Sequence, residues 1–217
     1  MQKSDEQSLT VEAAPSRARG RPRAFDRDAA LRQAMLLFWR KGYEATSISE
    51  LTEAMGIGSP SLYAAFGSKD ALYAEALRYY GSTYEMLVWG NFNAAGTARD
   101  AVIALLMDSA AALSGSVVDI PCGCMVALST VGSEGHAELG ELVRSQRSVT
   151  YERLKTRLDR AVTDGEISPT TDITGLARFL QTVQFGMSIL ARDGAGRMEL
   201  EDVATVAIAG MDARIAG

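Results

Sequence analysis

The feature that most constrains the fold is the close succession of two short helices in the stretch TSISELTEAMGIGSPSLYAAFG. Ser47 and Glu50 have the spacing of a capping box and predict the start of the first helix, which is about eight residues long. In the second, Ser59 is the expected N-cap and Pro60 takes the first helical position, where its missing N–H costs nothing. With the longer amphipathic helix expected at residues 27–41, this is a helix-turn-helix pattern.

The second short helix has an unusually small outer face. Leu62, Ala65 and Phe66 form the apolar stripe that holds it to the other helices, and Tyr63 is expected to point outward. A helix that enters the major groove of DNA needs a narrow outer face and hydrogen-bonding groups near its N-terminus. The serine hydroxyls at 59 and 61 supply such groups, so the composition favours DNA contact; an ordinary solvated surface is the alternative for Tyr63 and Lys69.

The remaining sequence also shows helical spacing of its apolar residues, with no persistent period-two alternation. Clusters of Gly, Pro, Asp and Ser divide it into segments. We therefore expect an all-α protein of about nine helices. Beyond the three described above, the expected helices are 69–89, 97–113, 122–131, 136–163, 172–192 and 200–215.

The stretch LFWRKGYEATSISELTEAMGIGSPSLYAAFGSKDALYAEAL resembles the N-terminal domain of the TetR/AcrR family of transcriptional regulators, and the likeness covers roughly residues 25–72. The resemblance implies a dimeric regulator, in most members a repressor, that binds a palindromic DNA operator and is released by a small-molecule effector. Lys69 matches a phosphate-binding lysine that opens the fourth helix. The full set of positions that it implies in DNA contact is Ser47, Ser49, Ser59, Pro60, Ser61, Tyr63 and Lys69.

The sequence departs from that family at Ala64 and Ala65, where many members have bulkier DNA-facing side chains. The stretch SRARGRPR, which precedes the first helix, offers a compensation. Its Arg19, Arg21 and Arg23 are expected to form an arm that reads the adjacent minor groove, with a merely solvated basic tail as the alternative.

The charge distribution supports a separate DNA-binding module. The net charge is −5, yet residues 16–80 hold ten Lys or Arg against seven Asp or Glu. We expect three parts: a disordered tail at 1–16, the arginine arm and helix-turn-helix domain at 17–72, and a helical effector-binding and dimerisation domain at 73–217. The N-terminus lacks the apolar region of a signal peptide, and no apolar run is long enough for a membrane span, so a cytoplasmic protein without a membrane partner is expected.

The C-terminal body is expected to hold the effector. Its methionines and aromatic residues give it a soft interior that suits an apolar or aromatic ligand, although plain core packing explains each of them as well. The candidate lining residues are Met86, Trp89, Met107, Met125, Tyr151 and Phe185.

The resemblance also implies a homodimer through the last two long helices, and each of these helices has an apolar stripe. Packing of the stripes within a single subunit is the alternative. The stripe residues are Ile173, Ala177, Leu180, Val183 or Gln184, Met187 and Leu190 on one helix, and Leu200, Val203, Ala207, Gly210 or Met211, and Ile215 on the other.

Cys122 and Cys124 stand two residues apart in PCGCMV. They are either structural thiols or reactive thiols that sense an oxidant or electrophile. A weaker resemblance of the piece at 123–125 to one subgroup of the family implies that a helix begins near Cys122, beside the effector pocket.

Other classes of site find little support. Two cysteines and one histidine cannot build a closed four-ligand zinc site within one chain, so no metal is expected. There is no Gly-rich phosphate loop and no convincing catalytic triad, so neither an enzyme nor a cofactor is expected. An architectural DNA binder without an effector is the third interpretation.

Overall fold

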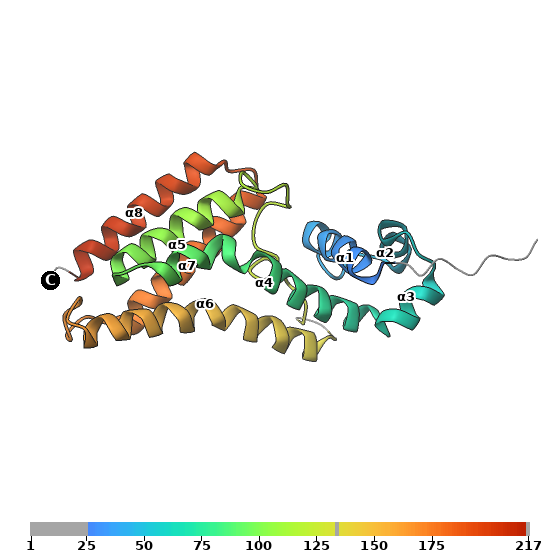
Figure 1. Ribbon diagram of the computed structural model, residues 1–217, viewed down its shortest axis with the longest axis horizontal. Helices are drawn as coiled ribbons and strands as arrows, with labels where there is room; N and C mark the ends of the chain where they lie inside the picture. Colours follow the sequence, from blue (N-terminus) through green and yellow to red (C-terminus); the bar gives the residue numbers. More distant parts are fainter. Residues whose placement is uncertain (1–25, 133–134, 216–217) are drawn as a thin grey trace, which may run out of the picture.

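The computed structural model describes residues 26–132 and 135–215, and in these ranges it consists of helices joined by turns and loops (Figure 1). The predicted all-α class is confirmed, since the described residues contain no strand, but they form eight helices instead of nine. None of these helices is both long and apolar enough to cross a membrane. In chain order they are α1 (Arg27–Lys41), α2 (Ile48–Met55), α3 (Ser59–Phe66), α4 (Lys69–Ala94), α5 (Ala98–Leu113), α6 (Ala137–Thr163), α7 (Ile173–Arg192) and α8 (Arg197–Ile215).

Side-chain caps set the starts of several helices where the sequence predicted them. Asp26 accepts hydrogen bonds from two backbone N–H groups of α1, and Ser47 and Glu50 form the predicted capping box of α2. Ser68 and Thr97 cap α4 and α5 in the same way. Each cap satisfies N–H groups that the first turn leaves without an intrahelical partner, which is why these local signals predicted the boundaries well.

The prediction that Ser59 caps α3 is wrong. Gly58 occupies the N-cap position, and its carbonyl oxygen accepts hydrogen bonds from the N–H groups of Ser61 and Leu62, so the helix begins one residue earlier. No side chain caps this end of α3. The Ser59 hydroxyl therefore does not cap the helix.

The prediction of a helix at 122–131 is also wrong. This segment is a series of turns, and we call it the strap. Gly123 has a φ of +79°, a conformation that interrupts a helix. Side chains take up the backbone carbonyls that a helix would use: Arg147 donates to those of Val126 and Ala127 at 3.1 and 3.2 Å, and Trp39 Nε1 donates to that of Gly123 at 3.0 Å. One i to i+4 bond remains, from the Leu128 N–H to the Cys124 carbonyl oxygen at 3.0 Å, and side chains on distant helices bind several of the other carbonyls.

Two apolar cores share α4. The first core joins α1–α3 to the N-terminal half of α4, where Leu72 and Leu77 are buried, and it also takes Met125 from the strap. The second core contains Trp89 and Phe92 of the C-terminal half of α4, together with residues of α5–α8. In Figure 1 α4 accordingly runs from the small N-terminal group of helices into the larger C-terminal bundle.

The stripes predicted to form the dimer contact are mostly buried inside the chain. Ala177, Leu180 and Met187 of α7 and Leu200 of α8 belong to the second core, so the alternative of packing within one subunit is correct for them. A different face of the same two helices carries large exposed apolar side chains. These are Phe179, Ile189, Leu190, Met198 and Val206, of which Leu190 alone was in a predicted stripe.

The turn at Gly123 leads to a testable expectation about the strap. A Cβ atom at Gly123 would lie 2.5 Å from Leu128 Cδ1 and 2.7 Å from the Ser188 carbonyl oxygen, whereas a Cβ atom at Gly165, with a φ of +77°, would meet nothing within 4 Å. Gly165→Ala should cost about 1–2 kcal/mol of unfolding free energy through its backbone conformation alone. Gly123→Ala should cost at least about 1 kcal/mol more, because the clash adds to the same strain. Denaturant unfolding of both variants measures the difference, and equal losses would contradict the packing described for the strap.

Candidate functional site

The exposed face of α3 carries the residues expected to contact DNA. Leu62 and Phe66 are buried, whereas the Tyr63 side chain is 47% exposed, so the predicted inward and outward assignment is confirmed. Ser59 and Ser61 are also exposed, as is Pro60. The helix thus offers a narrow outer surface of two hydroxyls and one phenol, anchored by two apolar side chains.

Of the two serines at the start of α2, Ser47 has the less available hydroxyl. The Ser47 hydroxyl accepts a hydrogen bond from the Glu50 N–H at 3.2 Å and donates to the Glu50 carboxylate at 2.9 Å. Ser49 is exposed, and its carbonyl oxygen accepts a hydrogen bond from Thr52. Ser47 therefore primarily holds the helix start in place, and Ser49 has the freer side chain. Arg19, Arg21 and Arg23 lie outside the described residues.

Lys69 begins α4 next to a group of aromatic and acidic side chains. Its ammonium nitrogen lies 4.2 Å from the centroid of the Tyr43 ring, a cation–π contact that orients it. The Tyr43 hydroxyl donates to Asp70, and His136 Nδ1 lies 3.1 Å from the other oxygen of that carboxylate. The bond from Tyr43, followed by that from His136, lowers the pKa of Asp70, and burial raises the pKa of Tyr43. This cluster orients Lys69 and links the start of α4 to the start of α6.

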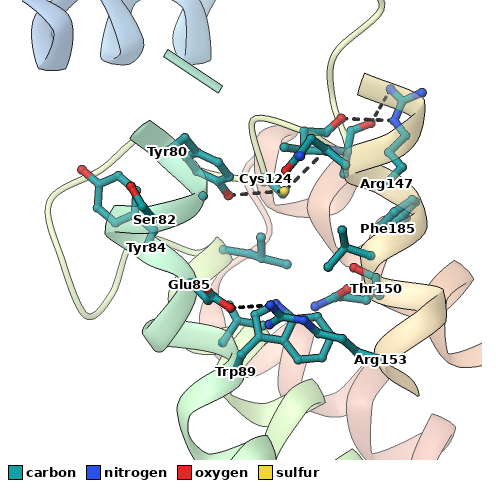
Figure 2. A pocket seen from close by; sticks show the side chains of 18 of the residues that line it. Tyr80, Ser82, Tyr84, Glu85, Trp89, Cys124, Arg147, Thr150, Arg153 and Phe185 are labelled. Atoms are coloured by element: carbon teal, nitrogen blue, oxygen red, sulfur yellow. Dashed lines mark hydrogen bonds and ion pairs between the residues drawn. The ribbon is translucent and has the colours of Figure 1, made fainter. Parts of the chain in front are cut away.

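A cavity of about 390 Å³ lies between the middle of α4, α6, α7 and the strap (Figure 2). This volume is in the range of small-molecule sites. One part of its wall is apolar and consists of Val88, Trp89, Leu113, Val126, Ala127, Val149 and Phe185. The other part is polar and includes Arg78, Tyr80, Ser82, Tyr84, Glu85, Cys124, Gln146, Arg147, Thr150, Arg153 and Gln184.

An ion pair joins α4 to α6 across the cavity. Arg153 Nη2 donates to the Glu85 carboxylate, and the guanidinium carbon of Arg153 lies 4.9 Å from the centroid of the Trp89 ring. Figure 2 shows Glu85 and Arg153 directed toward one another from their two helices, with Trp89 beneath them. The pair is therefore placed where a ligand would meet it.

The sulfur of Cys124 lies in the cavity wall and accepts two hydrogen bonds. Tyr80 donates its hydroxyl at 3.3 Å, and the backbone N–H of Ala127 donates at 3.5 Å. Burial raises the pKa of Tyr80, and the neighbouring Cys124 sulfur raises it further. The phenol therefore stays protonated and can donate this hydrogen bond. Cys122 has a different environment, because its thiol donates to the Ser114 carbonyl oxygen and does not line the cavity.

Two of the six candidate lining residues from the sequence, Trp89 and Phe185, line this cavity. The other four do not: Met86 is 71% exposed, Met125 is buried in the first core, and Met107 and Tyr151 pack with the second. Of the polar residues of the wall, the sequence pointed only to Cys124, and it missed the others. On α6 the sequence did contain an indication of this polar wall. Arg147, Thr150 and Arg153 follow one another at intervals of three residues, which places them on one face of the helix.

The strap connects the cavity to the helix-turn-helix. While Cys124 faces the cavity, Arg192 at the end of α7 donates to the carbonyl oxygens of Cys122, Trp39 and Arg40 at 2.9–3.0 Å. Trp39 in turn donates to the strap at Gly123. The C-terminal end of α1 is thus hydrogen-bonded both to the strap and to α7.

Within the described residues, no group of three or more His, Cys, Asp or Glu is arranged to hold a metal ion.

Comparison with known proteins gives concordant matches. The family model described as bacterial regulatory proteins, tetR family, matches residues 30–76. The chain is 37% identical over 195 residues to the HTH-type transcriptional repressor ComR of Escherichia coli (strain K12), a match that covers 87% of this chain and 90% of ComR. It is 48% identical over 68 residues to the HTH-type transcriptional repressor BdcR of the same organism, which covers 31% of this chain and 34% of BdcR.

Among solved structures, a cysteine mutant of the TetR family transcriptional regulator CifR, complexed with 26-bp double-strand operator DNA, is similar along nearly its whole length. The TM-score is 0.81 at 39% sequence identity, and the match covers 87% of this chain and 98% of that one.

Proposed function

Because the chain belongs to the TetR family of bacterial regulatory proteins, we propose that it is a transcriptional repressor that binds double-stranded operator DNA as a homodimer and leaves it when a small molecule enters the cavity. The observation that carries this proposal is the 37% identity with a transcriptional repressor over 87% of the chain. A repressor of this kind acts in the cytoplasm and needs no catalytic group.

In the proposed complex, α3 lies in the major groove. The outward Tyr63 hydroxyl and Lys69 bind phosphates, and the hydroxyls of Ser59 and Ser61 reach base edges or the backbone. Ser49 adds a contact from the start of α2, where Ser47 mainly serves as the cap. We assign the arginines at 19, 21 and 23 to an adjacent minor groove.

We assign the dimer contact to the exposed apolar face of α7 and α8. Large apolar side chains on a water-facing surface are typical of an interaction site. Small residues favour close helix approach on this face: Gly210 is exposed, and a Cβ atom added there would lie 3.9 Å from Phe179 Cζ. A twofold axis at this face would present two copies of α3 to one face of the DNA, and operator binding needs them about 34–36 Å apart.

Release by an effector is proposed to act through α4 and the strap. Both line the cavity, and both also belong to the core of the DNA-binding helices. A ligand that binds better to an arrangement with a different spacing of the two α3 helices lowers operator affinity by that difference in binding free energy. The cavity argues against an architectural DNA binder without an effector.

The operator itself can be found by selecting bound DNA from a random pool. We expect a palindrome whose half-sites are one helical turn apart, because two α3 helices related by a twofold axis read equivalent sequences. Recovery of no enriched sequence would contradict a specific repressor.

Substitutions on α3 and α4 test the DNA interface. The double variant Tyr63→Phe/Lys69→Ala should bind all sequences more weakly, and its salt dependence should have a slope smaller by about two, because each of the two subunits loses the phosphate contact of its lysine. Ser61→Ala should instead change the preference at one base position. Lys155→Ala is the control, since Lys155 pairs with Asp159 on α6, away from α3. Operator titrations at several salt concentrations measure these effects, and wild-type affinity of the double variant at physiological salt would refute the assignment.

A second candidate function is a thiol-sensing repressor, favoured by the two hydrogen bonds to the Cys124 sulfur in the cavity wall. In this case an oxidant or a quinone modifies Cys124 in place of ligand binding. We expect Cys124→Ser to abolish DNA release by a quinone, and Cys122→Ser, whose sulfur lies outside the cavity lining, to retain it. Gel-shift titration with quinone tests both, and undiminished release from Cys124→Ser would exclude this mechanism.

A further inference from the structure

We propose that the ligand of the cavity is an organic anion with a flat apolar body, and that its anionic group binds Arg153 in competition with Glu85. The inference rests on the proposed effector role of the cavity and specifies the chemical class of the effector.

The charge of the cavity wall is the first argument. Three guanidinium groups, those of Arg78, Arg147 and Arg153, line the cavity, whereas Glu85 is the one carboxylate among the lining residues. The hydrogen bonds of Arg147 go to backbone carbonyl oxygens of the strap, which are neutral. The wall thus has an excess of positive charge, and such a concave site attracts an anion.

Arg78 does not change this balance. The acidic side chain that interacts with it, Glu75, already receives two hydrogen bonds from Arg27, at 2.6 and 2.8 Å. The carboxylate near Arg78 is therefore engaged by a different guanidinium group. The excess positive charge of the wall persists when this neighbouring pair is included.

Arg153 is the best-placed receptor for the anionic group. Its contact with Glu85 uses the single nitrogen Nη2, so the fork of N–H donors is not fully engaged by that carboxylate. Its position over the Trp89 ring keeps the guanidinium plane at the edge of the apolar wall. A carboxylate bound there in a bidentate manner would place an attached ring against that wall.

The apolar wall determines the body of the ligand. Trp89 and Phe185 contribute aromatic side chains to the wall, and Val88 and Val126 complete an apolar surface that suits a flat ring system. At about 390 Å³ the cavity accommodates a ligand of two fused rings with one polar substituent. The site is thus matched to an aromatic or similarly flat carboxylate.

The position of Glu85 links binding to release. Glu85 is on α4 and Arg153 is on α6, so their ion pair ties the two helices together. A ligand anion that draws Arg153 away leaves the Glu85 carboxylate without its cationic partner, next to a second negative charge. Repulsion and the lost bond then favour a displacement of the middle of α4, which continues into the core of the DNA-binding helices.

Three ligands that differ in charge test this proposal by isothermal titration calorimetry on the full chain: 2-naphthoate, 2-naphthylmethanol and 2-naphthylmethylammonium. We expect naphthoate to bind about tenfold or more tightly than the neutral alcohol, because a charge-assisted hydrogen bond is added, and the ammonium compound to bind most weakly. Glu85→Gln should tighten naphthoate binding by removing the competing carboxylate. Arg153→Met should abolish the preference for naphthoate over the alcohol, and Arg153→Lys should keep part of it.

The control is Arg160→Met, which removes an arginine of the same helix that pairs with Asp164 away from the cavity. It should bind naphthoate like the wild type. Equal affinity for naphthoate and the alcohol, no binding of naphthoate, or a preference that survives Arg153→Met would each overturn the proposal.

Operator binding by the same samples separates this failure from that of the proposed function. Wild-type protein that binds its operator but does not prefer naphthoate contradicts only the anionic ligand. Wild-type protein that binds no operator contradicts the repressor itself. Because Glu85→Gln leaves Arg153 and the apolar wall unchanged, it tests the competition even if Arg153→Met fails to fold.

Discussion

The anchoring of α4 in two separate cores is the constraint on which the rest of the structure depends. Leu72 and Leu77 are buried with the DNA-binding helices, and Trp89 and Phe92 with the C-terminal bundle. A leucine or phenylalanine side chain contributes about 1.5–3 kcal/mol when fully buried, so removing either end of the helix from its core has a large free-energy cost. The section between these anchors is different, because it faces the cavity with polar residues and can change its contacts at lower cost. Its position makes it the section through which a bound molecule can act on both ends.

The strap adds a second connection that works by hydrogen bonds. Its backbone carbonyls accept from Trp39, Arg147 and Arg192, which belong to three different helices, so the segment holds its shape only while those helices keep their relative positions. Met125 packs into the first core while the neighbouring Cys124 faces the cavity. The strap therefore connects the cavity wall to the end of α1 through contacts that do not include α4. Two connections of different chemistry make it harder for the DNA-binding helices to move independently of the body.

The sequence predicted what local interactions decide, and it failed where distant partners decide. Caps such as Asp26 and Ser68 act within one turn, so the corresponding helix starts were predictable. The strap has apolar residues that suit a helix, but the side chain of Arg147 from a distant helix takes its carbonyls. The stripes on α7 and α8 correctly indicated a buried face, yet periodicity does not reveal whether the same chain or a second copy buries it. The same limit applies to the polar face of α6 that contains Arg147, Thr150 and Arg153. From the sequence alone this face is typical of a solvent-exposed surface, and only the position of α4 shows that it lines a cavity.

The geometry of α3 also revises how much its small residues weaken DNA recognition. The sequence suggested that Ala64 and Ala65 both replace DNA-facing side chains, but Ala65 is half-buried against the first core, and Arg27 donates a hydrogen bond to its carbonyl oxygen while stacking on Phe66 at 4.4 Å. Ala65 is thus a packing position on the inner side of α3. Of the two alanines, Ala64 is the exposed one. In the proposed complex, α3 therefore lacks one DNA-facing side chain and not two, and the arginines proposed to lie in the minor groove would have less to compensate for.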